Sequence, residues 1–529
     1  MKLSRSFVCA ALVSGLALAG CSKDAPEKPY EVTEASLAQI SADLAAKKAT
    51  SVAVTQAYID RINMYDGALN AIITVVPDAL EQAAASDQRR AEGKALGPLD
   101  GVPVILKDNI DAVGTPTTAG SFALAENLPA QDAEVTKRLR AAGAIILAKA
   151  NLSQWAGYRT TDSFAGSSVG GTPHNPYDLT KSAAGSSSGS GIAMAVSFAA
   201  GALGTDTAGS ITGPSNVNGI VGLRPTRGLV SRRGIVPITE FQDTAGPMAR
   251  SVTDTAMLLT VLAGADQADP RTQEADTHKT DYAKALDANA LKGARLGVLR
   301  GSQKRSDEAL AVFNAALDVM RAQGAALVEL PGDLENLNVP GLEAEAYNFN
   351  HDVAAYLASA PAAVKTRTVA DLIAFHKTDP RESHINVQYF EEAAAASSDL
   401  QNPRYLELIE MVTRRSGAEG YGALLAQNNI TAIVTPAGDP ASVIPPDGTP
   451  RAGGRGDGPG SVTRNVAMAG YPLLTVPMGN VGGMPIGLSF VGAPWSEAQL
   501  LSYGYAYEQA GYKRVPPQAY KAAAQKAGN

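Results

Sequence analysis

The 529-residue sequence predicts an α/β protein in which a large mixed β-sheet is covered by helices on both faces. Short apolar runs, typical of buried strands, alternate with longer stretches in which apolar residues recur at helical spacing. An apolar fraction of 45% supplies enough material for a large core. We find no internal repeat of fixed period, so nothing indicates a repeat architecture.

Each predicted strand is a short apolar run bounded by turn-forming residues. These runs are 102–106, 144–147, 296–299, 326–330, 431–434, 473–476 and 486–491. Helices are predicted over 35–48, 51–65, 133–142, 192–198 and 308–323. Thr50 or Ser51 is a suitable N-cap for the second of them. Strands alternating with helices favour a parallel or mixed sheet buried on both sides.

Composition excludes several classes of protein. A net charge of −7 argues against a protein that coats nucleic acid. Both cysteines, Cys9 and Cys21, lie near the start, so the rest of the chain has neither a disulfide framework nor a thiolate metal site. The five histidines lack HxxxH spacing, and no phosphate-binding glycine loop occurs. We therefore expect no metal, no organic cofactor and no nucleic-acid partner.

The start of the chain has the pattern of an export signal. Lys2 and Arg5 precede an apolar stretch over 7–19, which is too short to span a bilayer. The stretch ends in Leu-Ala-Gly-Cys21, which resembles the lipobox of bacterial lipoproteins. This resemblance implies a signal peptide over 1–20, a lipid on Cys21, a tether over 21–33 and anchoring in the outer membrane facing the periplasm. The alternative is an ordinary signal peptide with an unrelated cysteine.

Three short segments carry candidate chemistry, and the first ends in Lys107-Asp108-Asn109. A lysine directly after a buried strand is unusual because an unpaired ammonium loses its hydration there. Desolvation lowers the pKa of such a lysine and can make it a base. The alternatives are a lysine that reaches the surface or one that pairs with Asp108.

The other two segments are rich in glycine and serine. One is Gly185-Ser-Ser-Ser-Gly-Ser-Gly191, directly before an apolar helix-like run. It reads as a tight loop that presents several hydroxyls, although a flexible linker or a G-x-S-x-G nucleophile elbow at Ser187 also fits. The other is Gly204-Thr-Asp-Thr-Ala-Gly-Ser210, where a serine follows a turn whose backbone N–H groups can hold an oxyanion. A plain turn is the alternative.

Together the three segments resemble the motifs of the amidase signature family. Ser186 and Ser210 are 24 residues apart, as in that family. The likeness continues through Gly222-Leu-Arg-Pro-Thr226 and Gln242-Asp243-Thr-Ala-Gly246-Pro247, covers 34–529, and is weakest over 265–430. The segment Gly170-Gly-Thr-Pro-His-Asn-Pro-Tyr177 is most similar to the peptide-amidase branch. The resemblance implies one catalytic domain over 34–529 with the amidase signature fold.

The resemblance also implies a mechanism for cleaving a carboxamide C–N bond. Neutral Lys107 takes a proton through Ser186, whose peptide bond to Gly185 is cis in the family, and Ser210 attacks to form an acyl-enzyme. The residues implied to hold the oxyanion through backbone N–H groups are Thr207, Ala208, Gly209 and Ser210, and those implied to support the site are Thr205, Asp206 and Ser190. Ala184, Ser188 and Ala208 replace family glycines, which puts the shape of the oxyanion turn in question.

The substrate is the least determined feature. In the peptide-amidase branch, a segment similar to 343–357 lies near the substrate, so Tyr347, Phe349 and His351 are candidates, with an amphipathic packing helix as the alternative. C-terminal peptide amides, acyl amides and small amides all remain open, and so does the oligomeric state. Two other roles compete: a non-catalytic amidase-fold lipoprotein that binds a ligand, and amide supply for transfer-RNA-linked amidation, which conflicts with the export signal.

Overall fold

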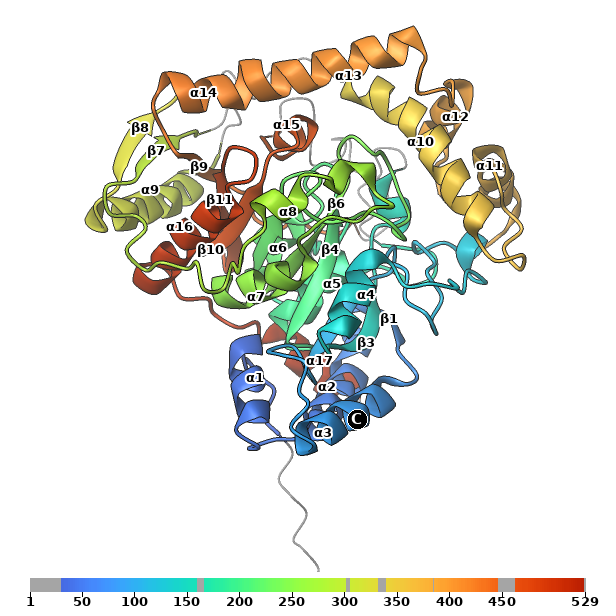
Figure 1. Cartoon of the computed structure of the whole chain (residues 1–529), viewed down its shortest axis with the longest axis horizontal. Coiled ribbons are helices and arrows are strands. Elements are labelled where there is room, and N and C mark those ends of the chain that lie inside the picture. The colour runs from blue at the N-terminus through green and yellow to red at the C-terminus, as the bar shows by residue number, and fades with distance from the viewer. Residues whose placement is uncertain are drawn as a thin grey trace, which may run out of the picture.

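A computed structural model describes residues 30–158, 166–300, 305–331, 339–383, 385–445 and 462–527. Their strands form one 11-stranded sheet in the order β1-β3-β2-β4-β6-β5-β10-β11-β9-β7-β8 (Figure 1). The sheet is mixed: β2 is parallel to β3 and β4, and β7 is parallel to β8 and β9, while the remaining pairs are antiparallel. The predicted fold class is confirmed. Cys21 and the predicted leader lie outside the described residues.

All seven predicted strands form. They are β2 (Pro103–Lys107), β3 (Ile145–Ala150), β7 (Arg295–Val298), β8 (Ala326–Glu329), β9 (Ala432–Pro436), β10 (Leu473–Val481) and β11 (Met484–Val491). The sequence patterns missed β1 (Ile72–Val75), β4 (Gly201–Asp206), β5 (Val221–Arg224) and β6 (Thr244–Ala249). The last three of these carry glycines, which break the apolar runs by which strands are recognised.

Helices lie on both faces of the sheet. On one face, α5 (Ser188–Ala195) packs beside α6 (Thr212–Asn218), and on the other α7 (Val252–Leu262) packs beside α16 (Glu497–Ala510) and α1 (Leu37–Ala45). Two glycines of β4 show why the helices sit so close. A side chain at Gly204 would meet Ser187 at the start of α5, whereas one at Gly201 would meet Leu258 of α7. Small residues in β4 therefore admit helices on both sides.

The remaining helices of this part cover the ends and edges of the sheet. They are α2 (Ser51–Tyr65), α3 (Ala79–Ala91), α4 (Glu134–Ala141), α8 (Ala275–His278), α9 (Asp307–Ala322) and α17 (Ala519–Ala527), with short 3-10 turns at Asp66–Ala68, Phe122–Leu124, Gln154–Gly157 and Pro270–Thr272. Thr50 is the N-cap of α2, since its side chain accepts from the Ala53 N–H at 3.1 Å.

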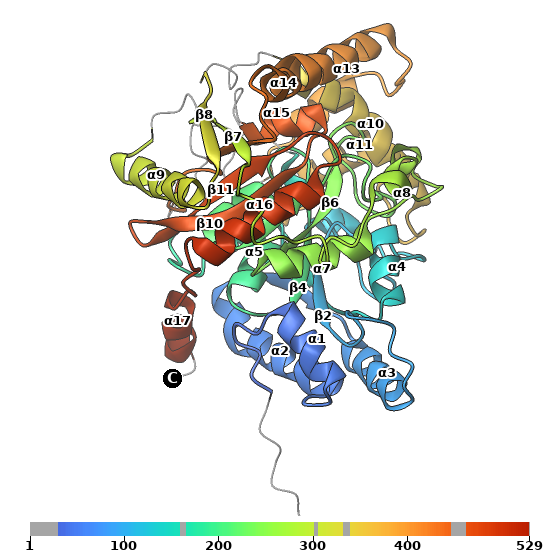
Figure 2. The same cartoon turned by 60° about the vertical axis from the view of Figure 1, so that its left-hand side comes forward.

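A group of helices lies along one side of the sheet and on top of it in the view of Figure 1. We call it the helical layer: α10 (Gly341–Ser359), α11 (Val369–Thr378), α12 (Gln388–Ala395), α13 (Pro403–Ser416), a π-turn at Gly417–Tyr421, α14 (Gly422–Gln427) and α15 (Val462–Ala469). Figure 2 shows the same layer above the strands after rotation. Among the described residues, no helix is both long enough and apolar enough to cross a membrane.

Candidate active site

The site forms where two parallel strands end side by side. Strands β2 and β4 pair in parallel, with Leu106 opposite Leu203, so their carboxyl ends meet at the same edge of the sheet. Lys107 is the last residue of β2, and Asp206 is the last residue of β4. The loop that holds Ser186 and leads into α5 reaches this edge, because Ser187 donates to Thr205 O at 3.1 Å. The fold thus brings together three segments that are far apart in the sequence.

Lys107 is fully buried and bonds to hydroxyl groups rather than to a carboxylate. Its Nζ lies 2.7 Å from Ser186 Oγ and 2.7 Å from Thr205 Oγ1. Burial lowers the pKa of Lys107 to about 7, although the Asp206 and Asp243 carboxylates favour the charged form. The predicted pairing of Lys107 with Asp108 does not occur, because Asp108 pairs with Lys149 at 3.0 Å. A lysine with this pKa can supply a neutral amine near neutral pH.

Ser186 sits in a loop that only small residues can form. The Gly185–Ser186 peptide bond is cis, and the Ser186 carbonyl accepts from the Ser153 N–H at 3.0 Å. A Cβ at Gly185 would lie 2.1 Å from Ser153 Oγ, and one at Gly189 would lie 2.3 Å from Ala71 O. Both positions therefore require glycine. Ala184 adopts a φ of 56°, so one departure from the family motif falls at a strained position.

Asp206 shapes the turn that precedes Ser210. Its Oδ1 accepts from the Gly209 N–H at 3.0 Å, and its Oδ2 accepts from the Ile211 N–H at 2.7 Å. The buried guanidinium of Arg224 donates to both Asp206 O and Asp206 Oδ1. Since the Gly209 amide is engaged by Asp206, the amides predicted for the oxyanion reduce in this structure to those of Thr207, Ala208 and Ser210.

The turn is also held from its other side. The Thr207 hydroxyl donates to Asp243 Oδ1 at 2.6 Å, and Gln242 Nε2 donates to Thr207 O at 2.9 Å. The positive φ of the turn, 111°, falls on Gly209 and not on Ala208. The methyl group of Ala208 therefore does not strain the turn, which answers the question raised by the sequence.

Accessibility increases across the three predicted catalytic residues. Lys107 is fully buried, Ser186 is 3% exposed and Ser210 is half-buried. The Ser210 carbonyl accepts from the Ser187 N–H at 3.2 Å, which fixes the turn against the serine loop. Thr205 contacts Lys107 directly, whereas Ser190 donates to Leu203 O at 3.0 Å and secures α5 to β4. The site thus has a closed end at Lys107 and an accessible end at Ser210.

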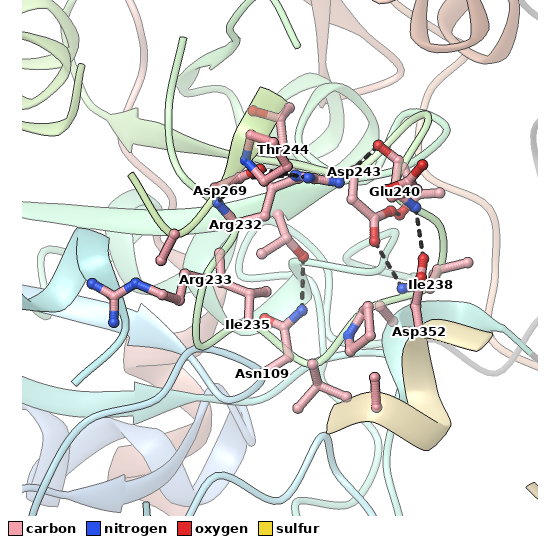
Figure 3. A pocket seen from close by; sticks show the side chains of 18 residues that line it. Asn109, Arg232, Arg233, Ile235, Ile238, Glu240, Asp243, Thr244, Asp269 and Asp352 are labelled. Atoms are coloured by element: carbon pink, nitrogen blue, oxygen red, sulfur yellow. Dashed lines mark hydrogen bonds and ion pairs between the residues drawn. The ribbon is translucent and has the colours of Figure 1, made fainter. Parts of the chain in front are cut away.

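A cavity of about 260 Å³ adjoins this site (Figure 3). It begins at Asn109, Thr205 and Thr207 and extends between the 232–244 segment and α10, which contributes Asp352 and Ala355. Burial, together with repulsion from Glu240 and Asp243, raises the pKa of Asp352 to about 6. Burial also raises the pKa of Asp243. The cavity therefore places ionisable groups close to the Lys107–Ser186 pair.

The structure separates the three substrate candidates of α10. Phe349 is fully buried and stacks on Tyr158 at 3.8 Å between ring centroids, so it packs in a core. Tyr347 packs near Tyr405, at 5.8 Å between centroids. His351 is 48% exposed at its side chain and pairs with Asp352 at 2.8 Å. None of the three lines the described cavity; their neighbours Asp352 and Ala355 do.

Several residues of the site were not singled out from the sequence. Asn109, Asp243 and Arg224 all fall within segments that resemble the family, but no local pattern distinguishes them from their neighbours. Asp352 lies in the divergent stretch and follows one of the named candidates. Only its distance from the carboxyl ends of β2 and β4 in the folded chain reveals its place.

Comparisons with known proteins agree with this geometry. The family model described as Amidase matches residues 53–501. The structure of native peptide amidase from Stenotrophomonas maltophilia is 40% identical with a TM-score of 0.86, covering 92% of this chain and 98% of that chain. A peptide amidase solved with the competitive inhibitor chymostatin is 41% identical with a TM-score of 0.86, covering 92% and 99%.

More distant relatives have two kinds of name. A probable amidase of Arabidopsis thaliana is 34% identical, with 92% of each chain covered. One component of the glutamyl-tRNA(Gln) amidotransferase of Moorella thermoacetica is 34% identical, with 88% of this chain and 94% of that one covered. The chain belongs to the amidase family, and it is an amidase, a hydrolase that acts on amides.

Proposed function

We propose that this protein is a serine amidase that cleaves a carboxamide C–N bond through an acyl-enzyme on Ser210. The observation that carries the proposal is the 2.7 Å contact between Lys107 Nζ and Ser186 Oγ, made by a buried lysine with a pKa of about 7. A serine hydroxyl is too weak an acid to attack an amide without a base. Neutral Lys107 supplies that base, and Ser186 passes the proton to it from Ser210.

Every proton in the reaction has a donor and an acceptor. Ser210 Oγ forms a bond to the amide carbon while its proton moves to Ser186 and the proton of Ser186 moves to Lys107. Backbone N–H groups of Thr207, Ala208 and Ser210 stabilise the developing oxyanion. Ser186 then protonates the leaving nitrogen, the C–N bond breaks, and ammonia or an amine departs. Water, activated by the same relay, hydrolyses the ester to release the carboxylate and restore Ser210.

Ser187, the serine of the G-x-S-x-G pattern, is a poor nucleophile by comparison. It is fully buried, its hydroxyl donates to Thr205 O at 3.1 Å, and it accepts from the Thr205 N–H at 3.3 Å. These bonds dock the start of α5 on β4. A hydroxyl engaged in this way cannot reach a substrate without undocking the helix.

We infer that the substrates include C-terminal amides of peptides. Two solved relatives with about two-fifths sequence identity are named peptide amidases, and each is covered almost completely by this chain. Amide supply for transfer-RNA-linked amidation is a weaker proposal, since the relatives with that name are less similar and the sequence begins with an export pattern.

Ammonia release from peptide amides, acyl amides and small amides tests the proposal, using residues 30–529. We expect turnover that is lost in Ser210→Ala, while Ser187→Ala, if it folds, retains measurable activity. A fluorophosphonate should label the wild-type protein at Ser210. A folded Ser210→Ala protein with undiminished turnover would falsify the assignment. No labelling and no turnover of any amide would favour the non-catalytic binding protein.

We further propose that the protein is exported and anchored through a lipid on Cys21. The motif Leu-Ala-Gly-Cys21 and the polar tether after it support this proposal. Metabolic labelling with a fatty acid should mark the full-length chain and not Cys21→Ala. Equal recovery of both proteins in the soluble envelope fraction would contradict the anchor.

A further inference from the structure

We infer that the cavity beside the Lys107–Ser186 pair is a subsite for a positively charged group of the amide substrate, an ammonium or a guanidinium. This inference rests on the proposed function, because it names the substrate class of the same site. Three features carry it: the balance of charge around the cavity, an unsatisfied buried acceptor in its wall, and an apolar stretch of lining next to the acidic one.

The two arginines of the cavity are already neutralised. Arg232 makes two contacts with Asp269, at 2.6 and 3.1 Å, in a paired geometry. Arg233 bonds to Asp266 at 3.0 Å and also to Glu134. Neither guanidinium is therefore free to attract an anion, and Glu240 is likewise matched, by Arg271 at 2.9 Å.

Two carboxylates of the lining have no lysine or arginine partner among the described residues. Asp243 accepts from the Thr207 hydroxyl and from the backbone N–H groups of Ile238 and Thr239. Asp352 accepts from the Glu240 N–H at 2.9 Å and contacts the exposed ring of His351. Buried carboxylates without a cationic partner raise the local negative potential. A cation that enters the cavity restores the balance.

Asn109 provides an independent sign of a missing ligand. The residue is 2% exposed and lines the cavity, as Figure 3 shows. Its Nδ2 donates to Thr205 Oγ1 at 3.0 Å, whereas its Oδ1 has no hydrogen-bond partner in the described part of the chain. A buried acceptor without a donor costs free energy, so a ligand N–H group is the complement that this wall requires.

The rest of the lining fits the stem of such a group. Ile235, Val236 and Pro237 form an apolar stretch between the two arginines and Asp243. Amphipathic chains bury their methylene groups on apolar surface and place the charge at a polar end. A volume of about 260 Å³ holds one side chain rather than a whole ligand. The chemistry is that of a lysine, an arginine or an aminoalkyl chain.

This charged group has two possible sources, the acyl part of the substrate or its leaving amine, and matched ligands separate them. The first arm compares Nα-acetyl-lysinamide with Nα-acetyl-norleucinamide. The second compares N-(4-aminobutyl)acetamide with N-pentylacetamide. Calorimetry on the Ser210→Ala protein measures affinity without turnover. We expect the cation of at least one pair to bind about 10-fold more tightly, as a desolvated charge-assisted contact implies.

Two variants in the Ser210→Ala background test whether the cavity is responsible. Asp352→Asn should reduce the preference for the cation at least about 3-fold. Glu343→Gln, on the same helix but exposed and paired with Arg404, should leave it unchanged. Equal affinity within both pairs, or a preference that survives Asp352→Asn, overturns the inference. Hydrolysis of norleucinamide by the wild type without any cation preference overturns the subsite and keeps the function. A preference without hydrolysis keeps the subsite and overturns the function.

Discussion

The sheet edge and the helical layer hold buried polar groups in different ways. At the sheet edge, Lys107 contacts only hydroxyl and carbonyl oxygens, and the fold leaves its pKa low. In the helical layer, the buried Glu382 carboxylate accepts from four donors: Ser121 Oγ, Phe122 N, Gln154 Nε2 and Ser168 Oγ. The first arrangement keeps a reactive group available, whereas the second saturates a group and fastens α11 and α12 to the core.

The difference teaches that burial alone does not mark a functional residue. A saturated buried charge contributes to stability, and an unsaturated one has chemistry left to do. His376 belongs to the saturated kind, since its Nδ1 donates to Leu372 O at 2.7 Å and its Nε2 accepts from Trp155 Nε1 at 3.3 Å. Substitutions in the two regions should therefore divide cleanly between activity and stability.

The largest effect is expected from Lys107→Ala. Loss of the base should lower kcat/KM by about 10⁴-fold or more. The unfolding midpoint should change little, because the variant removes a buried amine that has no carboxylate partner. Steady-state kinetics and thermal unfolding of the same preparation check both statements. Strong destabilisation with modest loss of activity would reverse the comparison.

The pH dependence of the wild type should follow the titration of Lys107. The neutral amine, which exists above its pKa, is the base, so kcat/KM should rise with pH and reach half its plateau near pH 7. Initial rates on a neutral amide from pH 5 to 9 measure the curve. A flat profile would contradict a lysine base.

Asp206→Asn should produce an intermediate effect at the sheet edge. The amide side chain has only one acceptor oxygen, so the Gly209 and Ile211 N–H groups lose part of their support. A distorted oxyanion turn costs roughly 10²–10³ in rate. Removal of the carboxylate should also move the pH midpoint downward, because Asp206 favours charged Lys107. The rate loss without the pH displacement would limit Asp206 to holding the turn.

In the helical layer, Glu382→Ala should act on stability. The variant leaves four donors without their acceptor, and the expected loss is about 3 kcal/mol of unfolding free energy. Urea unfolding measures it, with exposed Glu410→Ala as the control expected to lie within about 0.5 kcal/mol of wild type. A stable Glu382→Ala protein that has lost activity would assign this cluster to the chemistry instead.

The smallest effect is expected where the two regions meet. The Tyr356 hydroxyl donates to Asp111 Oδ1 at 2.8 Å and accepts from Asn127 Nδ2 at 2.9 Å, so it joins α10 to the loops after β2. Tyr356→Phe should cost about 1 kcal/mol. Urea unfolding and kcat/KM measured together show whether the loss stays in stability.

Sequence patterns recovered the strands with continuous apolar runs and the helices with clear periodicity. They missed β4 and β6, the central strands beside the site, because GALGTD and TAGPMA contain glycines that make room for helices. The same motifs drew attention to Lys107, Ser186 and Ser210. They did not reveal that Asp206 engages the Gly209 amide, since a side-chain bond across a turn leaves no period in a sequence.

The sequence by itself determined the fold class, the family and the three segments at the sheet edge, because each depends on local spacing of glycines, hydroxyls and apolar residues. The tertiary structure alone decided what surrounds them. Asn109, Asp243 and Asp352 lie far apart along the chain, and they meet because β2, β4 and β6 are neighbours and α10 crosses their carboxyl-end side. The order of strands follows from packing of the whole core, which no local pattern encodes.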